Sequence, residues 1–495
     1  MNRRIITISR EFGSRGRELG IHLSSHGQYG GLEYGKAGIG GGTVCPVLVW
    51  EVSMRIQLSD HFDYKRLLRF TFPSMVMMVF TSLYSVVDGF FVSNFVGKTP
   101  FAAVNFIMPV LMILGSIGFM FGSGGSALVS KTMGEGEPEK ARELFSLFIY
   151  STAVCGVIIA VISFFCIRPL AELMGAEGEM LNNCVVYGRI LLLALPFYML
   201  QFEFQSFFIA AERPQMGLVV TVVCGLTNMV LDALFMAVFF WGLVGAAAAT
   251  AVSQILGGLI SILYFCRADA GTLRLTKTKI DGRALLKACT NGSSELMSNI
   301  SMSVVSILYN YQLMQYAGEN GIAAYGVLMY VNMIFLAIFI GYATGVAPVV
   351  GYHYGAENHS ELKGLLRKSY VIIGIFAVAM FGLAEFLAGT LAGIFVGYDR
   401  ELMEMTERAF MIYSVSFLFS GIAIYGSSFF TALNDGLTSA LISFLRSLLF
   451  QVAAVIILPL IFGIDGIWFS VVAAELVAAV MTVLFIAAKR KKYHY

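Results

Sequence analysis

Charged residues are scarce in this chain of 495 residues: Asp, Glu, Lys and Arg make up 13% of it, whereas hydrophobic residues make up 58%. This balance excludes an ordinary soluble protein, in which about a quarter of the residues are charged. The net charge is only +2, which gives no sign of a nucleic-acid partner, and we expect none. Proline is also rare, with 10 residues against 51 glycines, as in membrane helices that pack through small residues.

Several chemical motifs are missing as well. The 7 cysteines are scattered, odd in number and form no C-x-x-C pair, so the sequence supports neither a disulfide framework nor a metal site. No Walker motif with Lys-Ser/Thr, no H-E-x-x-H and no nucleophile motif is present. These absences argue against a membrane enzyme or a nucleotide-driven pump, and we expect no cofactor.

Long apolar runs are what the sequence has instead. About twelve runs of 18 or more largely apolar residues are each long enough to cross a bilayer. They predict an all-α membrane protein with twelve transmembrane helices in two groups of six: 67–96, 103–130, 144–167, 183–211, 216–240 and 243–266, then 286–315, 322–352, 369–396, 406–430, 437–461 and 465–488. If the chain starts inside, twenty Lys and Arg residues flank the spans there and only Lys98, Arg168 and Arg400 lie outside. The positive-inside rule then predicts that both termini are cytoplasmic.

The first residues follow a different pattern. MNRRIITISREFGSRGRELG (1–20) contains a β-like run, Ile5–Ser9, and resembles the opening strand and phosphate loop of cytidylate-kinase-like proteins. The loop lacks the G-K-[ST] of a P-loop, and no kinase-sized soluble domain follows. We therefore expect residues 1–53 to be a disordered appendage, either a gene-fusion scar or the result of a start codon called too early, with Met54 as the true start.

The two groups of spans repeat each other in helices and in loops. The offset is 221 to 222 residues, as in Gly134 and Gly355 or in FFIAAERP at 207 and FFTALNDG at 429. Six spans per unit give both halves the same orientation, which is a parallel repeat typical of alternating-access transporters. We predict an N-lobe at 54–267, a cytoplasmic linker at 268–285 and a C-lobe at 286–495.

One polar pair stands out inside an apolar span. In TNMVLDALF, Asn228 and Asp232 are four residues apart and so share a helix face. A carboxylate at membrane depth costs about 2.5–3.5 kcal/mol, so such a group is rare and usually faces a partner or a cavity. The pair therefore indicates an ion or proton site, with an aspartate hydrogen-bonded for packing near a helix end as the alternative.

Several motifs together resemble the multidrug and toxic-compound extrusion (MATE) family, in particular its bacterial multidrug exporters, from about residue 58 to residue 490. The motifs are VDGFFVSNFVG, GSGGSALVSKTMGEG, FFIAAERP, TNMVLDALF, GLVGAAAAT, AAYGVLMYV, GVAPVVGYHYGAEN and FFTALNDGLTSA. The resemblance implies a two-lobed, twelve-helix exporter of organic cations in exchange for sodium ions or protons. It also implies an N-lobe cation site at Asp88, Asn228, Asp232 and Thr250, and a helix-bending proline at Pro73. Some relatives have an acidic residue in helix ten, which this chain lacks.

The chemistry of such a site suits either ion. Asp88 and Asp232 in one desolvated pocket do not both stay ionised cheaply, so they are expected to titrate as a pair. Two carboxylates, an amide oxygen and a hydroxyl also form the oxygen cage that a hard cation such as sodium prefers. Binding of either ion is expected to bias the helix that contains Pro73 between straight and bent forms.

Other charges at membrane depth have open roles. Glu203, in FYMLQFEFQSFF, either attracts a cationic substrate, joins a proton path or has a structural role; pairing with Arg189, about 21 Å away along the helix, is doubtful. Glu295 is a candidate for the substrate cavity, with an interfacial position as the alternative. The roles of Glu385 and Glu475 stay open, and Arg446 is expected to snorkel or pair.

The remaining alternative is a flippase for lipid-linked saccharides. Such proteins tend to line their cavity with several basic residues, whereas membrane-depth basic residues here are limited to about Arg189 and Arg446. We therefore favour a monomeric exporter in the lipid bilayer whose partners are small-molecule drugs, mainly organic cations.

Overall fold

The structure, a computed structural model, describes residues 5–8, 21–24, 56–267, 271–397 and 399–495. The chain forms two compact units, Met1–Arg55 and Ile56–Tyr495. In the first unit, strand β1 (Ile5–Ile8) pairs antiparallel with β2 (Ile21–Ser24). Strand β1 falls on the predicted β-like run. The rest of 1–53 lies outside the described residues, so its disorder stays a prediction.

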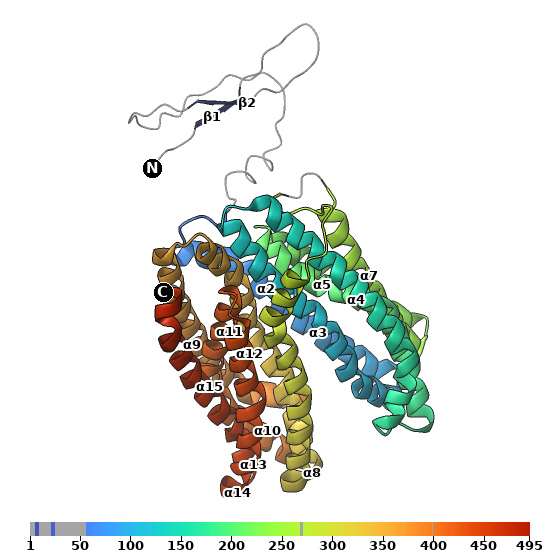
Figure 1. The fold of residues 1–495 in the computed structure, drawn as a ribbon. Helices are drawn as coiled ribbons and strands as arrows, with labels where there is room; N and C mark the ends of the chain where they lie inside the picture. Colours follow the sequence, from blue (N-terminus) through green and yellow to red (C-terminus); the bar gives the residue numbers. More distant parts are fainter. Residues whose placement is uncertain (1–4, 9–20, 25–55, 268–270, 398) are drawn as a thin grey trace, which may run out of the picture. The chain divides into compact units, whose positions relative to one another are not determined.

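The second unit is helical throughout (Figure 1). Its first half, the N-lobe, consists of α2 (Tyr64–Phe95), α3 (Lys98–Gly134), α4 (Pro138–Leu173), α5 (Gly178–Ala210), α6 (Pro214–Asp232), the π-helical turn η1 (Ala233–Val238) and α7 (Gly242–Phe265). Its second half, the C-lobe, consists of α8 (Gly282–Gly355), α9 (His359–Val396), α10 (Arg400–Ser414), α11 (Phe417–Ala432), α12 (Gly436–Phe444), η2 (Leu445–Phe450), α13 (Gln451–Ile457), α14 (Pro459–Phe462) and α15 (Ile464–Tyr493).

The predicted twelve spans are present in the described residues. Ten helical segments are individually long and apolar enough to cross a membrane, and α10 with α11 form one more span bent by 49°. Helix α8, at 74 residues, would be about 110 Å long if straight, against about 30 Å of hydrocarbon. Its backbone leaves the helical conformation at Gly318, with φ 61° and ψ −146°, so α8 contains two spans.

The internal repeat is visible in the backbone of the turns. Four left-handed positions of the N-lobe recur 221 or 222 residues later in the C-lobe, a conformation that favours glycine because it lacks a Cβ atom. The matched positions are Gly97 and Gly318, Gly136 and Glu357, Glu212 and Asn434, and Gly242 and Gly463. The two lobes therefore turn their chains in the same way although most of their side chains differ.

The lobes meet most closely at one end of the bundle. We call the end at which α2 begins and α3 ends the basic end, because most Lys and Arg residues lie in its loops. A Cβ atom on Gly124 of α3 would lie 2.0 Å from the carbonyl oxygen of Ala288 in α8, and one on Gly292 would lie 1.9 Å from that of Met120. These glycines let the backbones of α3 and α8 touch directly.

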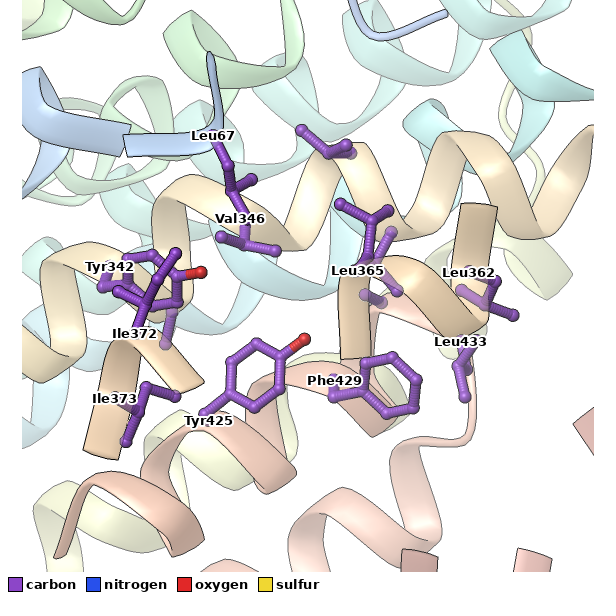
Figure 2. Close-up of a cluster of buried hydrophobic side chains, with 14 of the residues drawn as sticks. Leu67, Tyr342, Val346, Leu362, Leu365, Ile372, Ile373, Tyr425, Phe429 and Leu433 are labelled. Carbon is purple, nitrogen blue, oxygen red and sulfur yellow. The ribbon is translucent and has the colours of Figure 1, made fainter. Parts of the chain in front are cut away.

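A buried cluster near the basic end joins the two lobes. Leu67 of α2 lies beside Val346 of α8, and both are fully buried (Figure 2). The rest of the cluster comes mainly from α8, α9 and α11, including Tyr342, Leu362 and Phe429. The N-lobe therefore contributes to a core that otherwise belongs to the C-lobe.

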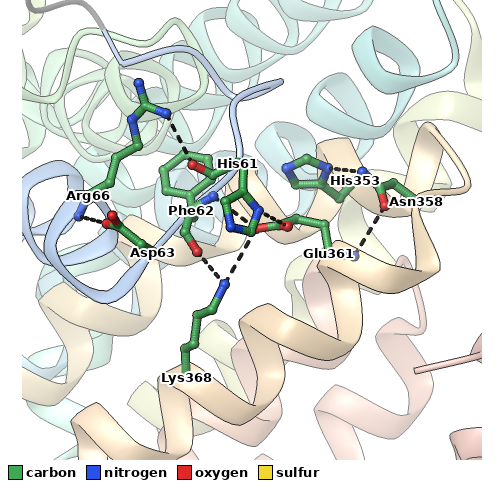
Figure 3. A network of polar contacts seen from close by, with 8 residues as sticks. All are labelled: His61, Phe62, Asp63, Arg66, His353, Asn358, Glu361 and Lys368. Carbon is green, nitrogen blue, oxygen red and sulfur yellow. Dashed lines mark hydrogen bonds and ion pairs between the residues drawn. The ribbon is translucent and has the colours of Figure 1, made fainter. Parts of the chain in front are cut away.

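The segment before α2, residues 56–63, binds both lobes, and Figure 3 shows its contacts with the C-lobe. The Leu58 N–H donates to the Glu212 carboxylate in the turn between α5 and α6, at 2.8 Å. The Phe62 N–H donates to Glu361 of α9 at 2.9 Å, and His61 Nδ1 lies 2.6 Å from the other oxygen of the same carboxylate. Lys368 donates to the Phe62 carbonyl. This segment therefore ties the N-lobe turn to the C-lobe at the basic end.

Candidate cation site

The polar pair found in the sequence lies where α6 changes to π-helix. Asn228 is 2% exposed and Asp232, the last residue of α6, is fully buried. The π-helical turn η1 starts at the next residue, Ala233. Such turns inside helices are frequent at functional sites, because they reorient the side chains around them.

The structure brings the other two predicted residues to the same place. The Asn228 amide nitrogen lies 3.5 Å from the Thr250 hydroxyl of α7. Asp88 of α2 lies close enough to Asp232 for the two carboxyl groups to interact. Apart from this mutual contact, one Asp88 oxygen and both Asp232 oxygens are buried without a hydrogen bond from any described residue. The four side chains together offer carboxylate, amide and hydroxyl oxygens, the donor set of a hard cation.

Two tyrosines complete the surroundings of the carboxyl pair. Tyr187 of α5 is fully buried and lies within electrostatic range of both aspartates. Its hydroxyl has no hydrogen-bond partner among the described side chains. Tyr84 lies one helical turn before Asp88 on α2 and close to it. Neither tyrosine was predicted from the sequence to belong to the site. The spacing of four residues to Asp88 was a usable signal for Tyr84, whereas nothing in the sequence indicates Tyr187.

Pro73 is buried within α2, which continues through it as one helix. It lies fifteen residues before Asp88, which is about 22 Å along the helix axis. Proline has no N–H, so the carbonyl four residues earlier loses its helical hydrogen bond and the helix is weakened there. Pro73 is thus a point at which α2 bends easily, although it lies outside the carboxyl pair's immediate surroundings.

At the matching place in the C-lobe, the groups that bond one another are neutral, and the acid within electrostatic range, Glu475, is paired with Arg446. The repeat offset of 221 places Tyr309 where the N-lobe has Asp88. The Tyr309 hydroxyl donates to Gln451 at 3.0 Å and lies 2.6 Å from the Ser470 hydroxyl. These groups satisfy one another, in contrast to the unpaired carboxyl oxygens of the N-lobe. The two lobes share a backbone pattern but not an acidic site.

The other acidic residues at membrane depth differ in their partners. Arg446 donates to both oxygens of Glu475, at 3.1 and 2.9 Å, as the sequence analysis expected of a paired arginine. Half-buried Glu295 on α8 lies within electrostatic range of the same Arg446. Glu385 accepts a hydrogen bond from Ser414 at 2.5 Å. Glu203 is fully buried inside the N-lobe, and neither of its oxygens has a hydrogen-bond partner in the described part of the chain.

Arg189 does not pair with Glu203. Its guanidinium lies 5.0 Å from the centre of the Phe164 ring, a cation–π contact within the N-lobe. Each of the two membrane-depth arginines thus has a partner, Phe164 for Arg189 and Glu475 for Arg446. The described residues also contain no group of three His, Cys, Asp or Glu side chains arranged to hold a metal ion.

This chain is similar in sequence to a known family and to proteins of known activity. The sequence model of the MatE family matches residues 73–234 and 296–457, which together exceed half of the chain. The multidrug export protein MepA of Staphylococcus saprophyticus is 25% identical over 438 residues, covering 87% of this chain and 94% of the relative.

Two solved structures share the fold. One is described as the outward-facing conformation of a multidrug resistance MATE family transporter; it superposes with a TM-score of 0.83 at 23% identity, covering 88% of this chain and 97% of that chain. Another is described as MATE in the straight conformation, with a TM-score of 0.83 at 22% identity, covering 88% and 98%. Identities this low show the shared fold alone.

Proposed function

This chain belongs to the MatE family, and we propose that it is a secondary active exporter of organic cations and other amphipathic drugs, driven by sodium ions or protons. The multidrug export activity named for the Staphylococcus relative supports the substrate class. The observation that carries the coupling proposal is the buried pair Asp88 and Asp232: the two carboxyl groups interact with each other, and one Asp88 oxygen and both Asp232 oxygens accept no hydrogen bond from another described residue. An unpaired buried carboxyl pair gains stability from a bound cation or proton, which makes it responsive to ion gradients.

The proposed mechanism couples charge in the N-lobe to the shape of α2. A cation or proton entering from outside reduces the negative charge shared by Asp88 and Asp232. The loss of repulsion changes the packing of α2 against α6, and Pro73 allows α2 to bend in response. The bend changes the surface that the N-lobe offers to the drug, which then leaves the protein to the outside.

The drug is proposed to bind between the lobes, near Glu295. Helix α8 is the C-lobe element that packs against α2 and α3 of the N-lobe, and Glu295 is half-buried on it. Its carboxylate supplies a counter-charge for a cationic substrate. Glu203 is not placed for that task, because it is enclosed within the N-lobe.

We propose that the protein is a monomer in a bacterial inner membrane with both described helix termini, Tyr64 and Tyr493, on the cytoplasmic side. The twenty Lys and Arg residues at the basic end support this orientation. The basic end, where α3 and α8 touch, is then the cytoplasmic end, and the described conformation is closed there.

The test is efflux of a fluorescent organic cation from cells that express the chain, with sodium and pH gradients imposed separately. We expect efflux to require one of the two gradients. Loss of efflux on removing the sodium gradient alone would identify sodium as the coupling ion, and loss on removing the pH gradient alone would identify the proton. Absence of efflux under both gradients, with the protein present in the membrane, would overturn the proposal.

A further inference from the structure

Glu203 of α5 is an acidic residue without a partner. It is fully buried, and both of its carboxyl oxygens lack a hydrogen bond from the described residues. Two membrane-depth acids of the C-lobe have such partners: Glu475 is bound by Arg446 and Glu385 by Ser414. A carboxyl retained only for packing would be expected to have such a partner, since burying an unsatisfied polar group costs free energy.

The surroundings of Glu203 hold no charge. The Thr152 hydroxyl of α4 lies close enough to act on the Glu203 carboxyl group, although neither side chain makes a hydrogen bond of ordinary geometry with any described residue. Within that part of the chain, no acidic or basic side chain of α3, α4, α6, α7 or α8 acts on it. Its neighbours along α5 are the buried Phe204 and Phe207. An ionised carboxylate would be uncompensated here, so this conformation requires the neutral, protonated form.

Glu203 lies toward the basic end, away from the Asp88–Asp232 pair. It is seven residues from the end of α5 at Ala210, or about 10 Å, whereas Asp232 is eighteen residues from the start of α6 at Pro214, or about 27 Å. Both distances are measured along the helices from the same end of the bundle. Glu203 is therefore a separate group and not a third member of the carboxyl pair.

Only a thin part of α3 separates Glu203 from the other lobe. The sequence there is GSGGS, residues 122–126. A Cβ atom on Gly122 would lie 3.0 Å from the Glu203 Cα atom, and one on Gly124 would lie 2.0 Å from the Ala288 carbonyl of α8. The same turn of α3 thus touches Glu203 on one side and the C-lobe on the other. Because the side chains of this turn are small, they cannot keep water away from Glu203 once α8 moves away.

We propose that Glu203 is a second proton-binding site, which meets cytoplasmic water only when α3 and α8 separate and which must be protonated again before they close. The proposal rests on the proposed alternating-access function, in which the basic end opens to the cytoplasm. On opening, the Glu203 O–H bond breaks and the proton passes to water, leaving a carboxylate. On closing, a cytoplasmic proton returns to the carboxylate, because the buried site tolerates only the neutral group. Glu203 thereby makes the return to the outward-open state depend on cytoplasmic pH.

The decisive variant is Glu203→Gln, which keeps the shape and is neutral at every pH. Efflux of a fluorescent organic cation is measured in proteoliposomes while the pH on the cytoplasmic side is varied and the coupling gradient is held constant. In the unmodified protein we expect efflux to slow as that pH rises, by up to about tenfold per pH unit, the limit for one titrating group. Glu203→Gln should still transport, with this dependence reduced to less than about twofold. The matched control is Glu385→Gln, which removes an acid bonded to Ser414 and should leave the pH profile unchanged.

Two results would overturn the proposal. One is a pH profile in Glu203→Gln that matches the unmodified protein. The other is loss of transport in Glu203→Gln at normal membrane content and normal melting temperature, because a permanently neutral group should be competent to close. Failure of the underlying exporter function is distinguishable, since the unmodified protein would then show no efflux. Infrared spectroscopy gives an independent check: Glu203→Gln should remove the C=O band of a protonated carboxyl.

Discussion

Gly134 and Gly355 each pack against the helix that carries the other. A Cβ atom on Gly134 would lie 2.0 Å from the Tyr352 carbonyl oxygen of α8, and one on Gly355 would lie 2.0 Å from the Lys131 carbonyl oxygen of α3. The two glycines are repeat equivalents, 221 residues apart, so the contact is nearly symmetric between the lobes. Neither helix can approach the other this closely with a larger residue, and the closed basic end depends on both glycines.

The first prediction concerns Gly355→Ala. Added volume at this contact forces the lobes apart, at a cost of about 1–3 kcal/mol for overpacking. We expect a shift toward conformations open at the basic end, measured as a longer distance between spin labels on the two lobes. Gly374→Ala in α9 is the control, because nothing lies within 4 Å of a Cβ atom there. Equal label distances in the two variants would contradict the prediction.

The segment 56–63 gives a second prediction. The Glu361 carboxylate accepts from the Phe62 N–H and pairs with His61, and Lys368 lies 3.9 Å away. Glu361→Ala removes these bonds, each worth about 1.5–3 kcal/mol when a charged group takes part. We expect a lower melting temperature in detergent and faster proteolysis of the segment. Glu357→Gln, at an exposed turn residue, should change neither measurement. If Glu357→Gln lowered the melting temperature as much as Glu361→Ala does, the effect would come from altering this loop in general.

Asp435 links the turn before α12 to the C-terminal tail. Burial alone would raise the pKa of this carboxyl, but bonds from Tyr493 at 2.7 Å and Lys489 at 3.1 Å outweigh it and hold the pKa below its usual value. A lowered pKa in the folded state stabilises the protein above the unfolded-state pKa of about 3.9, and this stability is lost as the pH falls through the folded-state pKa.

We therefore expect Asp435→Asn to lower the melting temperature at pH 7. The difference from the unmodified protein should shrink as the pH drops below about 4, where Asp435 of the unfolded chain takes up a proton, and should vanish below the lowered pKa of the native carboxyl. Melting curves across this pH range provide the measurement. If the melting temperature of Asp435→Asn stayed below that of the unmodified protein by the same amount down to the lowest pH, the charge of Asp435 would contribute nothing to stability.

The positions of the helices could be predicted from the sequence, whereas their local distortions, their bends and the side chains that they bring together could not. Apolar length and the repeat located all twelve spans because bilayer thickness and backbone hydrogen bonding leave few alternatives. Local chemistry gave no sign of the π-helical turn after Asp232 or of the 49° bend between α10 and α11, since both depend on packing between helices. The position of Tyr187 beside the carboxyl pair was likewise unpredictable, because it comes from α5, far from Asp88 in sequence.

The carboxyl pair itself gives a fourth prediction. Asp232→Asn keeps the size of the side chain and removes its charge, so a coupling ion loses one of its two carboxylate ligands. We expect efflux to fall to the level of cells without the protein, at unchanged membrane content. Glu172→Gln is the control, because Glu172 forms only an exposed pair with Arg168. Normal gradient-driven efflux by Asp232→Asn would exclude the pair from coupling.

The last prediction separates the two lobes. Tyr309→Phe removes the hydroxyl that bonds Gln451 and Ser470 at the C-lobe place matching Asp88. Two buried hydrogen bonds are lost, and we expect the protein to be destabilised by about 1–3 kcal/mol. The dependence of efflux on the coupling-ion gradient should nevertheless stay as in the unmodified protein, because Tyr309, Gln451 and Ser470 are neutral and the nearby Glu475 is already paired with Arg446. Tyr311→Phe, at an exposed position on α8, controls for loss of a tyrosine hydroxyl. If the ion dependence of efflux changed in Tyr309→Phe but not in Tyr311→Phe, the C-lobe would take part in coupling. The difference in side chains between the two lobes would then not confine coupling to the N-lobe.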